Sequence, residues 1–95
     1  MYVLVHHTIY DPERFWAKAQ ESLSALPSEL QLHQSLSATD GTLATCLWEA
    51  PSIHAVSSFL EPALAGTATN EYRRAEARDG VTVPNRYATV TPPTA

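Results

Sequence analysis

Four histidines, one cysteine and a few polar aromatic residues are the side chains of this sequence best suited to chemistry. An imidazole can bind a divalent metal, and it can also act as a general base near pH 7. Zinc and nickel accept imidazole ligands but need three or four that converge on one point. No HxH, HxxxH or CxxC spacing supplies a local pair. A nickel or zinc site at His6, His7 and His33 is therefore the less favoured hypothesis, behind structural or pocket-lining histidines.

The candidate ligand site adds residues from later in the chain. Trp48 is expected in the core or at a subunit contact, and Glu49 would orient an imidazole if it is buried beside His6 or His7. Tyr72 can hydrogen-bond a ligand, although an edge strand protected by charge is the simpler interpretation of residues 70–74. The candidate ligand-binding residues are His6, His7, His33, Trp48, Glu49 and Tyr72.

Two further residues belong beside this site. Cys46 lies mid-strand between Thr45 and Leu47, where a lone cysteine is usually a small core residue. A nucleophilic cysteine would need a base and an electropositive setting, so we expect Cys46 to be structural. Trp16, on the first predicted helix, can roof a pocket above the sheet.

The first predicted strand, residues 2–9, is apolar on both of its faces. His6 and His7 must point to opposite sides because neighbouring strand residues alternate. His7 then shares a face with Val3, Val5 and Ile9. A strand that is apolar on both faces is typical of the centre of a sheet covered on both sides. Two helices can cover only one face in a chain this short, so we expect a second subunit on the other.

The remaining elements follow from capping and turn signals. Asp11 caps a helix with Pro12 in its first turn, and Pro27 stops this helix near Leu26. Asp40 and Gly41 predict a tight turn, between strands at 29–37 and 42–49. The residues predicted to be buried are Phe15, Ala19, Leu23 and Leu26 on the helix, and Leu30, Leu32 and Leu36 on the strand at 29–37.

The second half of the chain predicts one more helix and strand. Ser52 caps the helix, which turns Val56, Phe59 and Leu60 inward and is broken or kinked at Pro62. We expect the fourth strand at residues 70–76, with residues 81–83 as the alternative. The order strand, helix, strand, strand, helix, strand predicts an α+β fold of the ferredoxin-like type, βαββαβ, with an antiparallel four-stranded sheet and two helices on one face.

Length and charge narrow the class of protein. A chain of 95 residues predicts one domain, residues 1–88, followed by a loose tail at 89–95. The net charge of −4 argues against nucleic acid as a partner. No apolar stretch approaches the roughly 20 residues that cross a bilayer, and no signal peptide is visible at the first residues. With a single cysteine, these features predict a cytoplasmic protein without a membrane partner.

Three segments carry a resemblance to a known group. The run from Thr45 to Ser52 (TCLWEAPS), the run from Phe59 to Leu64 (FLEPAL) and Asn70–Tyr72 (NEY) resemble small uncharacterised bacterial proteins. These belong to the dimeric α+β barrel superfamily, and the likeness extends over residues 2–76. The resemblance implies the fold and a homodimer. Two other sets of relatives are similar only in architecture: antibiotic-biosynthesis-type monooxygenases and nickel-binding ferredoxin-like proteins.

These observations leave three hypotheses for function. The first is a dimer that binds a small molecule or a divalent metal between sheet and helices. The second is a cofactor-independent enzyme, an oxygenase or isomerase, with a histidine as base and an apolar cavity for a flat substrate. The third is a structural or regulatory dimer without a pocket. A cavity with convergent polar groups would favour a ligand site.

Overall fold

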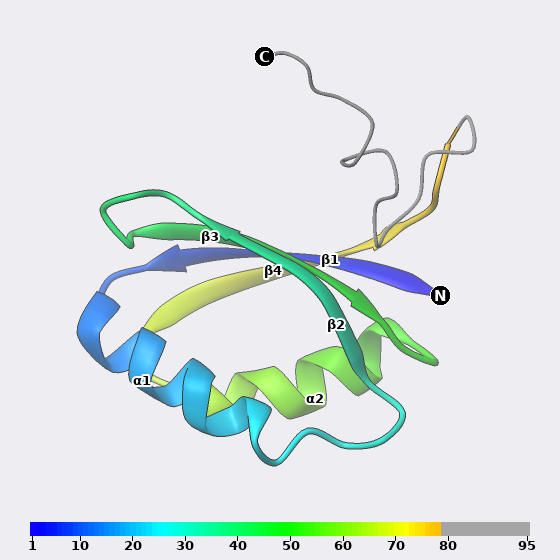
Figure 1. Ribbon diagram of the computed structural model, residues 1–95, viewed down its shortest axis with the longest axis horizontal. Coiled ribbons are helices and arrows are strands. Elements are labelled where there is room, and N and C mark those ends of the chain that lie inside the picture. Colours follow the sequence, from blue (N-terminus) through cyan, green and yellow to red (C-terminus); the bar gives the residue numbers. More distant parts are fainter. Residues whose placement is uncertain (79–95) are drawn as a thin grey trace.

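The computed structural model describes residues 1–78 and arranges them as one sheet covered by two helices. The elements run in the order β1 Tyr2–Ile9, α1 Pro12–Leu23, β2 Gln31–Ser37, β3 Leu43–Glu49, α2 Ile53–Ala63 and β4 Ala68–Ala75. The strands form an antiparallel sheet in the order β2-β3-β1-β4. Both helices lie against the same face of this sheet (Figure 1). The predicted ferredoxin-like α+β fold is confirmed.

The fourth strand begins two residues earlier than predicted, at Ala68. The alternative strand at residues 81–83 and the predicted tail at 89–95 lie outside the described residues. Within the described part of the chain, no helix has the length and apolar character of a membrane span.

The strand β1 lies at the centre of the sheet, as its sequence predicts. It pairs with β3 on one side and β4 on the other. Val3, Val5, His7 and Ile9 face the helices and are almost fully buried, whereas Leu4 and His6 lie on the opposite face. We call that opposite side, which neither helix covers, the open face. The prediction that His6 and His7 point to opposite faces of the sheet is therefore confirmed.

The alternation predicted for β2 is wrong after Leu32. The pairing with β3 shifts between Leu32 and Gln34, so His33 is the extra residue of a β-bulge. A bulge reverses the side to which the following residues point. Leu36 consequently lies on the open face, 67% exposed, instead of joining Leu30 in the core.

Both helices begin at the predicted caps. The Asp11 side chain accepts a hydrogen bond from the Arg14 amide, and the Ser52 side chain accepts one from the Ala55 amide. Helix α1 ends at Leu23, before the predicted stop near Leu26, and Leu23 itself is 44% exposed. The predicted stripe of α1 is thus only partly buried, while Val56 and Leu60 of α2 are buried as expected.

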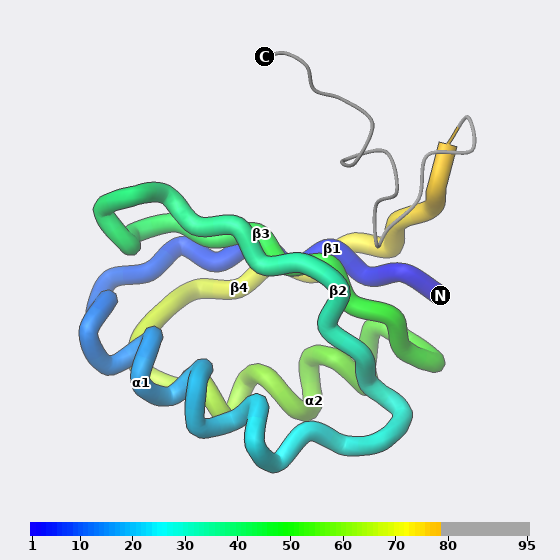
Figure 2. Tube along the Cα trace, viewed as in Figure 1, coloured from blue at the N-terminus to red at the C-terminus, as the bar shows by residue number. Residues whose placement is uncertain are grey.

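The β2–β3 hairpin reaches over the start of α1. Asp40 Oδ1 accepts hydrogen bonds from the Thr42 amide and hydroxyl, and Gly41 adopts a φ of +78°, a conformation that suits glycine. The Trp16 indole donates to the Gly41 carbonyl oxygen at 3.3 Å. Figure 2 shows this hairpin and the first turn of α1 at the same end of the molecule. The turn therefore holds Trp16 in place beside the sheet.

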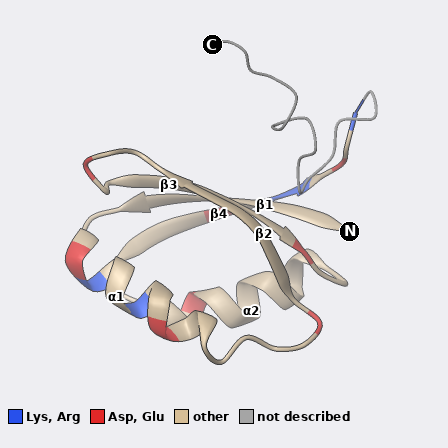
Figure 3. Ribbon diagram, viewed as in Figure 1, with Lys and Arg blue, Asp and Glu red and all other residues tan. Residues whose placement is uncertain are grey.

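Charged side chains of both signs lie along the first helix. Figure 3 shows Lys and Arg interspersed with Asp and Glu along α1. Arg73, Arg74 and Arg78 follow near the end of the described residues, where Arg78 forms an ion pair with Glu76.

Candidate functional site

An apolar cavity of about 390 Å³ lies between the sheet and the helices. This volume is within the range of roughly 300–1,000 Å³ typical of small-molecule sites. None of the residues that line it is an Asp, Glu, Lys or Arg. The lining consists of His7, Phe15, Trp16, Ala19, Gln20, Ser22, Leu23, Leu32, Ser35, Cys46, Trp48, Leu60 and Leu64. A cavity of this kind suits an uncharged, mainly apolar molecule.

His7 is the buried titratable group of this cavity, with only 2% of its surface exposed. Its Nδ1 lies 2.6 Å from Asn70 Oδ1 on β4, directly across the β1–β4 pairing. The ring also contacts the Phe15 ring edge-on, with 5.1 Å between centroids. The imidazole is thus held from two sides, by β4 and by α1.

A chain of hydrogen bonds continues from Asn70 to the second helix. Asn70 Nδ2 donates to Glu61 Oε2 at 3.0 Å, and the Tyr72 hydroxyl donates to the same oxygen at 2.5 Å. The bonds from Tyr72 and Asn70 lower the pKa of Glu61, so this carboxyl is ionised at neutral pH. Burial and the bond to Glu61 raise the pKa of Tyr72. Both groups therefore keep their donor and acceptor roles across the physiological range.

These partners select one tautomer of His7. A carboxylate can only accept, so Asn70 must turn its NH₂ group to Glu61 and its Oδ1 to the imidazole. Nδ1 of His7 therefore carries the proton. Burial lowers the pKa of His7, more than the Asn70 bond and the nearby Glu61 raise it. The ring is neutral at pH 7, and acid favours the unfolded chain, whose His7 takes up its proton at a higher pH.

Nε2 of His7 is the nitrogen available to a ligand. Nδ1 is turned to β4, and no residue of β4 lines the cavity. Nε2 has no hydrogen-bond partner among residues 1–78. In the neutral Nδ1–H tautomer this atom is a lone-pair acceptor, so the site presents one acceptor in mainly apolar surroundings.

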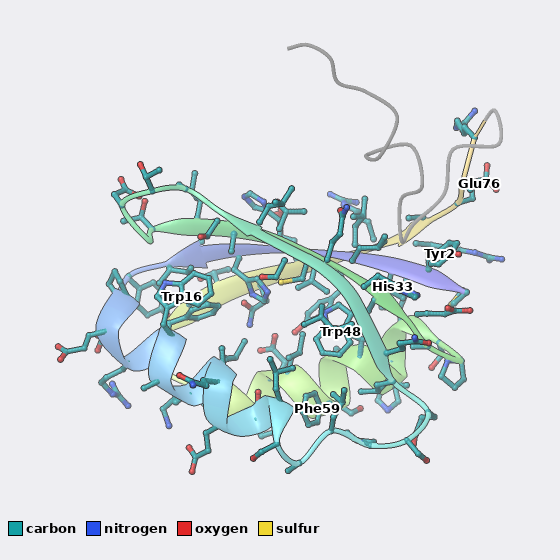
Figure 4. All side chains as sticks on the ribbon, viewed as in Figure 1. Tyr2, Trp16, His33, Trp48, Phe59 and Glu76 are labelled. Carbon is teal, nitrogen blue, oxygen red and sulfur yellow. The ribbon has the colours of Figure 1, made fainter. Side chains whose placement is uncertain are left out.

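Trp48 also lines this cavity, but its indole nitrogen is closed off from it. The residue is 2% exposed, and its Nε1 is the one buried side-chain nitrogen or oxygen without a hydrogen-bond partner in the part of the chain that the structure describes. Its ring packs edge-on against Phe59 of α2. Figure 4 shows Trp48 and Trp16 both directed into the space between sheet and helices. The prediction that Trp16 roofs a pocket agrees with its place in the lining.

Cys46 lines the cavity but is held as a neutral thiol. Burial raises its pKa, which outweighs the opposing effect of its hydrogen bond to Ser35. The thiol donates to Ser35 Oγ at 3.5 Å. No imidazole among residues 1–78 bonds to the sulfur, so its surroundings are those of a core residue.

His33 and Glu49 form a separate pair that does not reach the cavity. His33 Nε2 lies 2.9 Å from Glu49 Oε1, and its ring contacts the Tyr2 ring edge-on. Glu49 and Tyr2 face each other across β1 and β3 on the open face. Glu49 is about half exposed and does not lie beside His6 or His7, so the condition for it to orient either ring is not met. Glu49 bonds to His33 instead, and the residue that orients the His7 ring is Asn70.

The predicted site residues thus divide into three groups. His7 and Trp48 line the cavity. Tyr72 lies behind it, bonded to Glu61. The open face carries His6, whose Nδ1 is 3.3 Å from Thr45 Oγ1, together with the His33–Glu49 pair. Sequence reasoning missed Asn70 and Glu61 as the groups that orient His7, because only the β1–β4 register brings them together.

The three histidines proposed as metal ligands do not converge. His7 faces the helices, and His6 and His33 belong to the other side of the sheet. No group of three His, Cys, Asp or Glu side chains that can hold one metal ion is found within residues 1–78. The predicted nickel or zinc set is therefore not assembled by a single chain.

Comparisons with protein-family models, curated proteins and solved structures found no match to this chain.

Proposed function

We propose that this protein binds a small, uncharged, mainly apolar molecule in the cavity between the sheet and α1. The observation that carries the proposal is His7. It is a buried imidazole with a free Nε2 that faces an apolar cavity of about 390 Å³. Nε2 keeps a lone pair that no side chain among residues 1–78 uses, so a ligand hydroxyl or N–H group can donate to it.

A binding role is favoured over a purely structural one by the way His7 is supported. A structural histidine needs partners for its ring nitrogens, yet here only Nδ1 has one among the described residues. The Asn70–Glu61–Tyr72 chain fixes the tautomer in which Nε2 accepts. Second partners that set the orientation of an imidazole are typical of functional histidines.

The test is to fill the cavity and measure binding of ethylnaphthalene, an apolar fluorescent probe. Ala19 lines the cavity from α1 and is half-buried, so Ala19→Phe places a ring inside it. We expect saturable binding to the native protein and at least a tenfold loss in Ala19→Phe. Fluorescence titration gives the affinity, and circular dichroism confirms the fold.

The matched control is Ala17→Phe. Ala17 lies two residues earlier on α1 and is exposed, so the same added ring points to solvent and binding should be unchanged. Absence of saturable probe binding to the native protein, or equal binding to Ala19→Phe, would contradict the proposal.

Proton transfer by His7 is the second candidate function. The Nδ1–H bond to Asn70 orients the ring so that Nε2 can accept a proton, as a general base must. The pKa of His7 is lowered by burial, which weakens it as a base. For this reason a cofactor-independent enzyme ranks behind a binding protein.

We also propose a homodimer in which the open faces of two sheets pack together. Among the described residues, the open face is partly apolar, since it carries Leu4, Leu36, Leu43 and Leu47. Leu4, Leu36 and Leu43 are exposed, and apolar side chains gathered on one exposed surface are typical of an interaction site. The resemblance to dimeric α+β barrel proteins points to the same arrangement.

Leu47→Arg tests the dimer. Leu47 lies opposite Leu4 in the middle of the sheet and is half-buried in a single chain. A charge there would be desolvated at a sheet-to-sheet contact, so we expect light scattering to report a dimer for the native protein and a monomer for the variant. Ala17→Arg on α1 is the control and should stay dimeric. A native protein that is monomeric at tens of micromolar would refute the arrangement.

A further inference from the structure

Nε2 of His7 is an accessible atom of a side chain that is otherwise closed off. His7 is 2% exposed, and its Nε2 has no hydrogen-bond partner among residues 1–78. In this part of the chain, the one side-chain nitrogen or oxygen that is both buried and without a partner is Trp48 Nε1. Nε2 is therefore not buried, and the small exposed part of the ring includes it. Because His7 lines the cavity, a molecule inside can reach this nitrogen.

The other polar side chains of the cavity wall are bonded within the chain or exposed. Trp16, Ser22 and Cys46 each donate a hydrogen bond to an oxygen of the protein. Gln20 and Ser35 also line the cavity and are exposed. Recognition by hydrogen bonding inside the cavity therefore depends chiefly on the free imidazole nitrogen.

Glu61 decides whether that nitrogen accepts or donates, although it lies outside the cavity. Neither Glu61 nor Asn70 is among the lining residues. The carboxylate of Glu61 can only accept, so the Asn70 amide turns its NH₂ group to Glu61 and its oxygen to His7 Nδ1. The proton stays on Nδ1, and Nε2 keeps its lone pair. An Asn70 amide in the reverse orientation would donate to Nδ1, and the proton would then lie on Nε2.

A lone pair at Nε2 distinguishes two kinds of neutral ligand. A hydroxyl group can donate to it and regains in the cavity a hydrogen bond that it made to water. A carbonyl oxygen only accepts, so its burial beside Nε2 costs the hydrogen bonds that water supplied. Charged groups are disfavoured too, because none of the lining residues is an Asp, Glu, Lys or Arg and an unpaired buried charge is unfavourable.

We propose that the cavity selects neutral hydroxyl compounds over carbonyl compounds, and that Asn70 and Glu61 set this selectivity from outside. The ligand hydroxyl donates to His7 Nε2, and its apolar body lies against the rings of Phe15 and Trp16 in the cavity wall. The proposal rests on the cavity being a small-molecule site and adds the chemical class of the molecule. Asn70 and Glu61 are positioning residues, since they act on the ligand only through the imidazole.

The experiment compares three naphthalenes at pH 7. Naphthol carries a hydroxyl group, acetylnaphthalene a ketone, and ethylnaphthalene neither. Glu61→Ala removes the acceptor that orients the Asn70 amide, so both tautomers of His7 become accessible. We expect the ratio of naphthol to acetylnaphthalene affinity, measured by fluorescence titration, to fall about three- to tenfold, as the change of one neutral hydrogen bond predicts. The ratio removes effects of the variant on cavity shape that the probes share.

Tyr72→Phe is the matched control for Glu61→Ala. The Tyr72 hydroxyl donates to the same Glu61 oxygen as the Asn70 amide does. Its removal leaves the carboxylate in place to accept from Asn70, so the ratio of naphthol to acetylnaphthalene affinity should be unchanged. His7→Phe removes the acceptor itself. It should lower the ratio of naphthol to ethylnaphthalene affinity by a factor similar to that of Glu61→Ala.

The outcomes separate this inference from the proposed function. If ethylnaphthalene fails to bind the native protein, the cavity is not a small-molecule site and both proposals fall. If it binds and His7→Phe leaves the naphthol-to-ethylnaphthalene ratio unchanged, the binding function stands and the hydroxyl class is refuted. An unchanged naphthol-to-acetylnaphthalene ratio in Glu61→Ala, or an equal fall in Tyr72→Phe, refutes the control of selectivity by Glu61. Should His7→Phe not fold, the Glu61→Ala comparison decides by itself, because Glu61 is exposed and its replacement leaves the core intact.

Discussion

Replacing Phe15 by alanine is expected to lower the free energy of unfolding by about 3–5 kcal/mol, the usual cost of truncating a fully buried aromatic residue. Phe15 is 2% exposed, and its ring contacts His7 and Trp16 edge-on at centroid distances of 5.1 and 4.7 Å. Domains of this size have roughly 5–15 kcal/mol in total. The variant should therefore unfold at far lower denaturant concentration, as urea denaturation will measure.

Leu23→Ala on the same helix is the control for Phe15→Ala. Leu23 is 44% exposed, and alanine is the better helix former, so the loss should stay below about 1 kcal/mol. Equal losses for the two variants would mean that the core does not close around Phe15 as described.

Replacing Asn70 by leucine should lower the free energy of unfolding by about 1–3 kcal/mol and release the tautomer of His7. Leucine has a similar size but accepts no hydrogen bond, so the buried Nδ1–H of His7 loses its only described partner. The proton is then free to move to Nε2, which would end the acceptor role of that atom. Nitrogen chemical shifts of the His7 ring report the tautomer directly.

Thr69→Val provides the comparison for Asn70→Leu. Thr69 is the preceding residue of β4, exposed and on the opposite side of the strand. Its replacement keeps strand propensity and leaves the imidazole untouched. If Asn70→Leu keeps both the native stability and the Nδ1–H tautomer, Asn70 does not control His7.

Local patterns of the sequence predict much of the fold. The Asp11 and Ser52 caps begin the two helices where they were expected, and Asp40–Gly41 forms the predicted turn. The apolar alternation of residues 2–9 also predicts a central strand with His6 and His7 on opposite faces. Each of these depends on steric or hydrogen-bonding preferences within a few residues, which is why a single sequence reveals them.

The β-bulge at His33 could not be predicted from such local patterns. Strict alternation places Leu36 beside Leu30, yet the extra residue turns Leu36 outward. Nothing in the spacing of residues 29–37 encodes this insertion, because the register of β2 against β3 sets it. The same holds for Glu49, whose partner proved to be His33.

By itself, the sequence determined the order of the elements, the α+β fold and the side of the sheet to which each neighbouring histidine points. Only the tertiary structure decided which histidine matters and how. Asn70 meets His7 through the β1–β4 register, and Glu61 reaches Asn70 because α2 packs against β4. Contacts between residues so distant along the chain arise from packing of whole elements, whereas capping, turns and alternation act within a few residues.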